Sequence, residues 1–340
     1  MLLARAPPPP SVPSAASAPP RRKSILRPRC VPSPRTAVAM SGAAKAAPFL
    51  GGQNHKQVAS VANPLVKHCV KLRLSVTYRR SCRRIVLVGL APILEVCRFE
   101  FSAIENLLLL DGTELPEELY EFSGNVVYVS AAVMKKVSGM QSVDSTEAIA
   151  VIHMPKYFCD RDSHLGGAVL DELFSSAKRI LVLDGIQDPG NLGTLIRSAC
   201  AFRWDGVFLL PACCDPFNEK ALRAARGASL QLPVVSGNWS DLRGLMAKYD
   251  LKMLAGHPER SGNGSERTHT LSKELSDSLI SESVCLVLGS EGNGLSAETL
   301  QACELVNIPM EGTFESLNVS VAGGIFLFML QTKRKKMAEL

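Results

Sequence analysis

Short apolar runs separated by amphipathic segments recur along most of the chain. Runs of four to six aliphatic residues are typical of buried strands, whereas apolar residues three or four apart mark one face of a helix. In the second half, this pattern predicts strands at 180–183, 206–210, 232–235, 252–255, 284–288 and 305–308. It predicts helices at 192–203, 218–228, 239–249, 271–281, 296–303 and 317–334. Such alternation is typical of a parallel α/β sheet.

A smaller alternation comes before it and predicts a mixed α/β domain over 56–155. Its strands are expected at 85–88, 107–110, 126–129 and 148–152. Its helices are expected from Val58 to about Tyr78, with Pro64 at a helix start, and then at 91–100, 116–122 and 131–137. Residues 156–177 contain Gly166, Gly167 and several polar residues and indicate a linker, which leaves 178–335 as the second domain.

The first 50 residues have no periodic apolar face and cannot bury enough surface to offset chain ordering. Residues 1–94 carry 16 Lys or Arg and no acidic residue, whereas the remainder carries 22 basic and 32 acidic residues. Arg and Ser without acid are the pattern of an organellar transit peptide. The many prolines are awkward for an amphipathic mitochondrial helix, so we expect a chloroplast address, with the mitochondrion as the alternative and cleavage between 35 and 55. An ordinary disordered basic tail is the other interpretation.

Cysteine and histidine usage predicts neither a disulfide framework nor a metal site. The ten cysteines form no Cys-x-x-Cys pair, and the six histidines are scattered. Reduced thiols in the core are the better interpretation. The apolar stretch from Val319 to Leu330 is too short to cross a bilayer, so we expect a buried helix face and no membrane contact.

Three short blocks of the second half combine glycine with polar side chains, and each follows an apolar run. They are 188–197 (DPGNLGTLIR), 288–296 (LGSEGNGLS) and 308–321 (IPMEGTFESLNVSV). In α/β sheets, ligands bind at loops beyond the carboxyl ends of parallel strands, so the three blocks predict one composite site. The second block lacks the lysine of a P-loop and the spacing of a dinucleotide-binding loop.

Each polar residue of these blocks also has an ordinary structural explanation. Asn191 and Ser316 are favoured residues for capping a helix start. Arg197 has apolar neighbours, so we expect it on or beside a buried face, where its charge needs a partner. Glu291 stands among glycines, and its carboxylate can accept hydrogen bonds from a ligand or from an arginine such as Arg197.

Taken together, the three blocks resemble the signature motifs of the SpoU (TrmH) family of RNA ribose 2′-O-methyltransferases, in the SPOUT superfamily. The resemblance covers about 150 residues, from Arg179 to about Leu330. It implies an α/β-knot fold, a parallel sheet with a deep trefoil knot at its C-terminal end. It also implies S-adenosyl-L-methionine as cofactor, a homodimer and no metal. Ala225 departs from the family pattern, in which relatives usually carry Ser.

The resemblance also assigns roles to individual residues. Those at positions the family uses for catalysis and RNA contact are Arg197, Asn191, Glu291, Ser316 and Asn318. Those expected to hold the cofactor are Leu288, Gly289, Glu291, Gly294, Ile308, Met310, Leu317 and Asn318. Arg197 is assigned to the reacting 2′-hydroxyl with an adjacent RNA phosphate, although a free arginine is a poor base. Asn191 and Glu291 are expected to fix Arg197 and the ribose.

The small domain resembles the family's N-terminal RNA-binding domain, which is similar to ribosomal proteins L30e and L7Ae. The resemblance rests on Asn63-Pro64, Val66-Lys67 and Lys71-Leu72. A basic patch follows, from which we expect RNA contacts by Lys67, Lys71, Arg73, Arg79, Arg80, Arg83 and Arg84. A solvated basic helix explains the same patch without RNA.

The sequence therefore predicts an S-adenosylmethionine-dependent RNA 2′-O-methyltransferase, with organellar rRNA as the expected substrate. A tRNA substrate stays open. A non-catalytic RNA-binding ribosome-assembly factor with the same fold is the alternative from another class, which the intact polar residues of the three blocks disfavour. A nucleotide-dependent oxidoreductase is disfavoured by the missing dinucleotide fingerprint.

Overall fold

The computed structural model describes residues 56–98, 104–120, 122, 124–142, 148–155, 158, 167–258, 268–292, 294–314 and 316–332. The predicted transit segment 1–50, residues 156, 157 and 159–166 of the expected linker and the stretch 262–266 lie outside the described residues. The remainder of the expected linker includes a helix, α5 (Gly167–Phe174).

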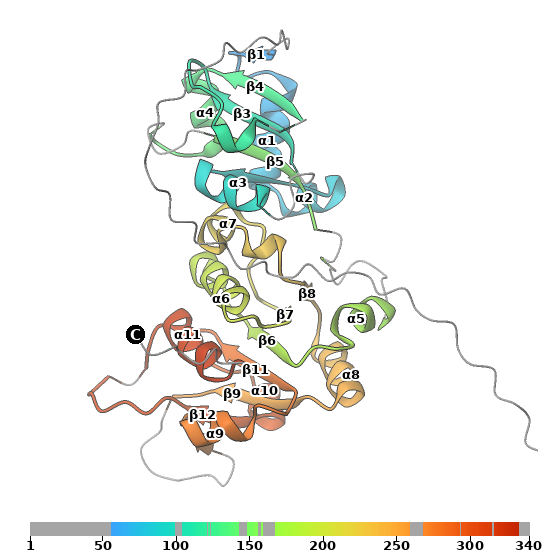
Figure 1. The fold of residues 1–340 in the computed structure, drawn as a ribbon, viewed down its shortest axis with the longest axis vertical. Coiled ribbons are helices and arrows are strands. Elements are labelled where there is room, and N and C mark those ends of the chain that lie inside the picture. The colour runs from blue at the N-terminus through green and yellow to red at the C-terminus, as the bar shows by residue number, and fades with distance from the viewer. Residues whose placement is uncertain are drawn as a thin grey trace, which may run out of the picture. The chain divides into compact units, whose positions relative to one another are not determined.

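The first sheet has five strands and mixed strand directions (Figure 1). Its strands are β1 (Lys56–Val58), β2 (Arg84–Val88), β3 (Ile104–Leu110), β4 (Asn125–Val129) and β5 (Ala148–His153). They lie in the order β1-β4-β3-β5-β2, with β5 antiparallel to both of its neighbours and the other pairs parallel. The mixed α/β prediction for this region agrees with this sheet, although the three-residue strand β1 was not predicted.

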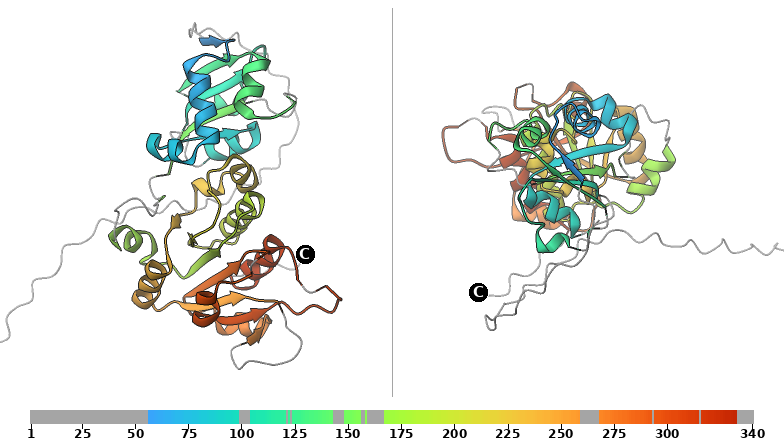
Figure 2. Two further views of the ribbon diagram at one scale, coloured as in Figure 1. Left: turned by 180° about the vertical axis from the view of Figure 1, so that it is seen from behind. Right: turned by 90° about the horizontal axis from the view of Figure 1, so that it is seen from above.

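Helices cover both faces of the five-stranded sheet. They are α1 (Pro64–Leu74), α2 (Val76–Cys82), α3 (Leu90–Cys97), the 3₁₀ turn η2 (Glu117–Leu119) and α4 (Ala131–Ser138). Apolar residues of α1 and α4 pack together in one cluster, and Ile93 and Val96 of α3 belong to the cluster on the other face. The view from above in Figure 2 shows α1 and α3 on opposite sides of this sheet. The single helix expected to run to Tyr78 is in fact two, because Ser75 ends α1 and its side chain accepts the Tyr78 N–H to cap α2.

The second sheet has seven strands, and all of its strand pairs are parallel. Its strands are β6 (Arg179–Asp184), β7 (Gly206–Leu209), β8 (Val234–Ser236), β9 (Lys252–Gly256), β10 (Thr268–Thr270), β11 (Val284–Gly289) and β12 (Glu304–Asn307). The order across the sheet is β10-β12-β9-β11-β6-β7-β8. The parallel sheet was predicted, but β10 was not, because Thr-His-Thr contains no apolar run.

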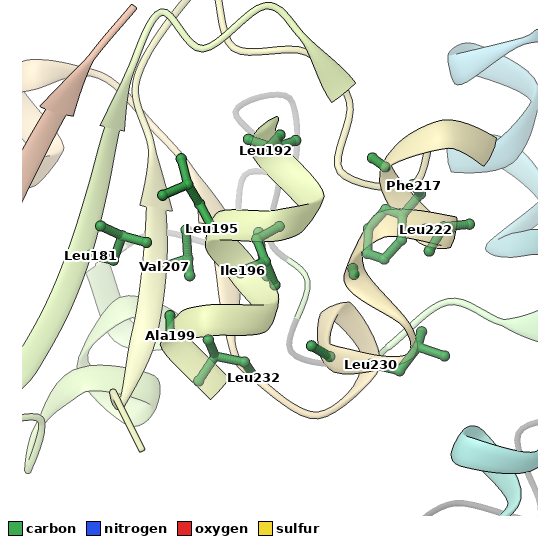
Figure 3. Packing of buried hydrophobic residues seen from close by; sticks show 14 of the residues in the cluster. Leu181, Leu192, Leu195, Ile196, Ala199, Val207, Phe217, Leu222, Leu230 and Leu232 are labelled. Carbon is green, nitrogen blue, oxygen red and sulfur yellow. The ribbon is translucent and has the colours of Figure 1, made fainter. Parts of the chain in front are cut away.

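The helices of the seven-stranded sheet are α5 (Gly167–Phe174), α6 (Pro189–Ala201), α7 (Glu219–Ala225), the 3₁₀ turn η3 (Ala228–Leu230), α8 (Trp239–Tyr249), α9 (Lys273–Ser278), α10 (Ala297–Ala302) and α11 (Val319–Met329). Side chains of β6 alternate between two cores, as the strand period of two requires. Leu181 and Leu183 face the core that includes α6 and α11, whereas Ile180 and Val182 face the core that includes α8. Figure 3 shows Leu195 and Ala199 of α6 against the strands.

One buried arginine ties the end of the chain's last described helix to the sheet. Arg179, at the start of β6, is 1% exposed and donates hydrogen bonds to the backbone oxygens of Leu330, Lys178, Glu282 and Leu279 at 2.6, 2.9, 2.5 and 2.7 Å. Burial lowers the pKa of its guanidinium, although nearby acidic groups oppose that effect. Because a buried charge must be compensated by hydrogen bonds, Arg179 engages all four carbonyls, and its bond to Leu330 ties the end of α11 to the start of β6.

Candidate active site

A pocket of about 310 Å³ lies beyond the carboxyl ends of three neighbouring strands. Residues that follow β12, β9 and β11 all line it, and these strands are adjacent in the sheet. Its lining residues are Gly256, His257, Pro258, Leu288, Gly289, Ser290, Glu291, Gly294, Leu295, Leu300, Ile308, Met310, Ser316, Leu317, Val319, Ala322 and Phe326. The second and third blocks of the sequence therefore meet in one pocket, as their positions after parallel strands predicted.

The pocket is mainly apolar, and Glu291 supplies the one carboxylate among the described residues that line it. Apolar pockets of a few hundred cubic ångströms with a few placed polar groups are typical of small-molecule sites. Leucine, isoleucine and phenylalanine side chains offer surfaces to a flat heterocycle, and the carboxylate offers a counter-charge to a cation. This combination of apolar side chains and one carboxylate fits a ligand that joins a purine to a positively charged group.

Two glycines let the backbone approach closely at the pocket. A Cβ on Gly289 would lie 2.4 Å from the Gly294 backbone oxygen, and one on Gly256 would lie 2.8 Å from the Phe326 ring. The Ser290 N–H donates to the Gly294 oxygen at 3.1 Å, and the Gly294 N–H returns a bond to Ser290 at 2.9 Å. The glycine loop after β11 is therefore a tight, hydrogen-bonded turn in which Gly289 has no space for a side chain.

Side chains from all three sequence blocks meet at Glu291. Its Oε1 accepts hydrogen bonds from the side-chain amide of Asn191 at 2.7 Å and from that of Asn318 at 2.6 Å. The Val319 backbone N–H, at the start of α11, donates to the same oxygen at 3.3 Å. The Asn318 amide also donates to Asn191 Oδ1 at 3.3 Å. These bonds join three separate segments, and the first and the last of them, at Asn191 and Asn318, are 127 residues apart in the sequence.

Local capping explains why the Asn318 amide points its nitrogen at Glu291. Asn318, not Ser316, is the N-cap of α11, and its Oδ1 accepts from the Ser320 N–H at 2.9 Å. With the amide oxygen engaged by the helix, the nitrogen faces the carboxylate. A carboxylate beside the N-terminus of an 11-residue helix is also stabilised by the helix dipole.

The first block likewise differs in detail from its predicted capping. Asp188 is the N-cap of α6, with Pro189 at the first helical position, and its side chain accepts the Asn191 N–H at 2.8 Å. The alternative interpretation of Asn191 as the cap of this helix is therefore wrong. Because Asp188 performs the capping, the Asn191 side chain is available to bind Glu291.

Arg197 was expected on or beside a buried face with Glu291 as a partner, and its placement differs. Its side chain is exposed on α6, and among the described residues the Glu291 carboxylate is bound by amides and a backbone N–H instead. Arg197 lies six residues beyond Asn191, which is about 9 Å along the helix axis. The assignment of Arg197 to the reacting hydroxyl stays a prediction.

Most of the residues expected to hold a cofactor line the pocket. These are Leu288, Gly289, Glu291, Gly294, Ile308, Met310 and Leu317, and Ser316 from the catalytic set joins them. Asn318 does not line the pocket and acts on it through Glu291. Sequence reasoning missed Gly256, His257 and Pro258 because no polar motif marks the end of β9. Only the strand order, which places β9 between β12 and β11, brings these residues to the site.

Three of the seven arginines and lysines expected to contact RNA are paired within the chain. Arg79 is 2% exposed and donates to Asp215 and to the backbone oxygens of Leu72 and Arg73. Arg73 pairs with Glu219 at 3.2 Å, and Arg84 pairs with Glu105. Arg79 is therefore a structural side chain in this arrangement.

The other four basic residues lie on partly or fully exposed surface. Lys67 and Lys71 are exposed on α1, and the Lys71 ammonium lies 5.5 Å from the centre of the Tyr78 ring. Arg83 donates to the Pro155 carbonyl at 2.9 Å, and Arg80 is half-buried. Their role in binding RNA stays a prediction.

The described cysteines are free thiols, and several are held protonated by burial. Burial raises the pKa of Cys69 and of Cys303 to about 12, and that of Cys213 to about 11. No group of three or more His, Cys, Asp or Glu in the described part of the chain could hold a metal ion. Among the described helices, none has both the length and the apolar character needed to cross a bilayer.

Comparison with known families identifies the region that carries this pocket. Residues 178–328 match the SpoU rRNA Methylase family. This SpoU-type region contains the whole seven-stranded sheet, the three blocks and the lining residues of the pocket. The resemblance inferred from the three blocks is confirmed for this region.

Similarity to individual proteins extends beyond the SpoU-type region. The chain is 29% identical over 281 residues to the 23S rRNA (guanosine(2553)-2′-O)-methyltransferase RlmP of Bacillus subtilis, covering 81% of this chain and 99% of the relative. Among solved structures, an RNA 2′-O ribose methyltransferase is 27% identical, with a TM-score of 0.62, and covers 81% of this chain and 97% of its own. An AdoMet-bound rRNA methyltransferase from Sinorhizobium meliloti is 25% identical, with the same TM-score and coverage.

Proposed function

We propose that this protein transfers a methyl group from S-adenosyl-L-methionine to a ribose 2′-hydroxyl of RNA, with organellar rRNA as its substrate. The observation that carries the proposal is the convergence of Asn191, Glu291 and Asn318 at an apolar pocket beyond β11 and β12. The family match and the names of the relatives, which act on rRNA and at 2′-O, support the same reaction.

The residues of the pocket fit the proposed cofactor. Apolar side chains such as Leu288, Ile308 and Met310 suit its adenine, and Glu291 is placed to balance its positive charge. When bound, the cofactor supplies a methyl group on a cationic sulfur, which is already electrophilic. The protein therefore has to align the ribose oxygen and ease loss of its proton, without a metal.

Each polar residue of the site has a task in this proposal. Asn191 and Asn318 hold the Glu291 carboxylate at the pocket, and Ser316, which lines the pocket, is assigned to ordering the cofactor. Arg197 would orient the reacting 2′-hydroxyl together with an adjacent RNA phosphate, and the hydroxyl proton would leave to that phosphate or to water, because a protonated guanidinium has no acceptor for it. The expected result for Arg197→Ala is loss of methyl transfer with cofactor binding retained. Unchanged turnover in that variant would remove Arg197 from the mechanism.

The proposal includes a homodimer, in which a second copy completes the site. Val321 and Phe328, seven residues apart on one face of α11, are 53% and 48% exposed, and Phe314 in the preceding segment is 82% exposed. Exposed apolar surface of this kind favours association with a partner. Light scattering on the purified protein tests this, because a monomer at micromolar concentration with full activity contradicts it.

The proposal also extends to the fold and the destination of the chain. The C-terminal part of the seven-stranded sheet forms the deep trefoil knot of the SPOUT superfamily, and the five-stranded region is an L30e-like RNA-binding domain. The insertion of β12 between β10 and β9 supports a non-sequential path of this kind. The acid-free first segment directs the protein to the plastid, which a fusion of residues 1–55 to a fluorescent protein tests.

The experiment that tests the reaction uses purified protein and methyl-labelled S-adenosylmethionine. Large-subunit rRNA transcripts and tRNA transcripts are incubated in parallel and then hydrolysed with alkali, because a 2′-O-methyl group protects the adjacent phosphodiester. We expect label in alkali-resistant dinucleotides from rRNA, and none with Glu291→Gln. Label in a base contradicts the ribose assignment, and label only in tRNA contradicts the rRNA assignment. RNA binding without cofactor binding favours a non-catalytic ribosome-assembly factor.

A further inference from the structure

Asp184, the last residue of β6, holds the far end of the glycine loop. Its Oδ2 accepts a hydrogen bond from the Ser296 backbone N–H at 3.0 Å and another from the Thr299 hydroxyl at 2.6 Å. Thr299 is completely buried, and its hydroxyl also lies 2.9 Å from that of Ser296. Asp184 itself does not line the pocket.

These bonds close the loop that carries Glu291. At its near end, Gly289 is paired in register with Asp184 across the parallel strands β11 and β6. At its far end, Ser296 is the N-cap of α10 and is bound by the same Asp184. Asp184 of the neighbouring strand β6 therefore contacts both ends of the loop. Between these ends, the Ser290–Gly294 bridge tightens the turn.

The position of Glu291 depends on where this loop is held. Its carboxylate reaches Asn191 and Asn318 only while the loop stays against β6, since Asn191 belongs to the helix that follows β6. A charged acceptor that receives two hydrogen bonds, one of them from a fully buried hydroxyl, is a strong local restraint.

We infer that Asp184 is a positioning residue for the cofactor pocket, which acts by holding the Glu291 loop through Ser296 and Thr299. The expected consequence of this restraint, a higher affinity for S-adenosylmethionine, rests on the proposed function. The restraint itself can be measured in the protein without any ligand, so the two can fail separately.

The restraint is tested by hydrogen exchange of the full chain, read on peptides that cover 285–299. Asp184→Ala and the nearly isosteric Thr299→Val should speed exchange in the loop, and Asp184→Asn, which keeps a neutral acceptor, should have an intermediate effect. Asp241→Asn is the matched control, because Asp241 also accepts a backbone N–H at a helix start, in α8 and away from the pocket. Unchanged loop exchange in Asp184→Ala overturns the inference.

The consequence is tested by titrating the same proteins with S-adenosylmethionine. Loss of a hydrogen bond to a charged group should raise Kd about tenfold in Asp184→Ala and less in Asp184→Asn. Thr299→Val should add little to Asp184→Ala, because both remove the same bond. Faster loop exchange with unchanged Kd overturns the positioning role. If the unaltered protein binds no S-adenosylmethionine, the proposed function fails, and the exchange data alone decide whether Asp184 restrains the loop.

Discussion

The two sheets of this chain are built from similar apolar strands, yet only one of them gathers polar side chains. In the five-stranded sheet, β1, β2, β3 and β4 run in one direction and only β5 is reversed, so the loop after β5 leaves at the edge opposite to the others. In the seven-stranded sheet, every pair is parallel, and the loops after β6, β9, β11 and β12 leave at one edge. Loops therefore gather at one edge in both sheets, and the polar residues of the three blocks, such as Asn191, Glu291 and Asn318, decide which edge carries the composite site.

The largest expected effect comes from the edge of the parallel sheet. In Gly289→Ala, the new Cβ would lie 2.4 Å from a backbone oxygen, so the loop must move. Displacement of a site by about an ångström costs on the order of 10²-fold in rate. Gly292→Ala is the matched control, since a Cβ there meets nothing within 4 Å. Equal rates of methyl transfer by the two variants would contradict the prediction that the geometry of this loop controls activity.

The next effect concerns a helix beside the five-stranded sheet. Arg79 on α2 is buried with Asp215, whose side chain is 11% exposed. Removing one partner of a buried ion pair costs about 3–5 kcal/mol, so Asp215→Ala should lower the free energy of unfolding by roughly that amount. Glu105→Ala breaks the more exposed pair with Arg84 and should cost less than about 1 kcal/mol. Urea unfolding of both variants tests this, and similar losses would contradict it.

A smaller effect on stability distinguishes the helix packing beside the parallel sheet from the pocket beyond its strand ends. A Cβ on Gly193 of α6 would lie 2.2 Å from the Ala221 backbone oxygen of α7, and overpacking costs about 1–3 kcal/mol. Gly193→Ala should therefore lower stability while the folded protein still binds cofactor. Gly244→Ala, in open space on α8, should raise stability by roughly 0.5–1 kcal/mol. Thermal unfolding and cofactor titration are the measurements. Loss of cofactor affinity in a folded Gly193→Ala variant would show that this helix packing also determines the geometry of the pocket.

The last effect involves both sheets, is absent at neutral pH and appears only in alkali. Burial raises the pKa values of Cys69 and Cys303 from 9.0 to about 12. Cys69 lies in the core of the five-stranded sheet, and Cys303 lies in a core of the seven-stranded sheet. Below pH 9 both thiols are protonated in either state, whereas above it the unfolded chain ionises first. Stability should therefore fall as pH rises from about 9 to 12. Replacing both residues by alanine should reduce this slope in urea titrations, although other buried thiols such as Cys213 still contribute to it. An unchanged slope would exclude Cys69 and Cys303 as a source.

Much of the fold was predictable because its signal is local. Strands such as β6 and β11 are continuous aliphatic runs, and Pro64 begins α1 as predicted. The short strands β1 and β10 contain almost no apolar residues, so they form only because a neighbouring strand offers its hydrogen bonds. The break at Ser75 was missed because a capping serine competes with a helical pattern that otherwise continues through it.

The candidate site was predictable in its residues but not in its contacts. Glu291 and Asn318 were both predicted as site residues from their blocks. Arg197 was an expected partner of Glu291, but the side-chain amides of Asn191 and Asn318 donate the hydrogen bonds to its carboxylate. Capping by Asp188 and by Asn318, rather than by Asn191 and Ser316, sets these orientations. His257 was missed because strand order is a long-range property that no local motif records.

The distance along the chain between the parts of the site has a consequence for how the protein is made. Asn191 and Asn318 are 127 residues apart, so a ribosome completes α6 long before it makes the helix that finishes the pocket. Contacts of such long range are slow to form. We therefore expect a nascent chain that ends before α11 to bind no cofactor, and the ability to bind it to appear late, as a marker of completed synthesis.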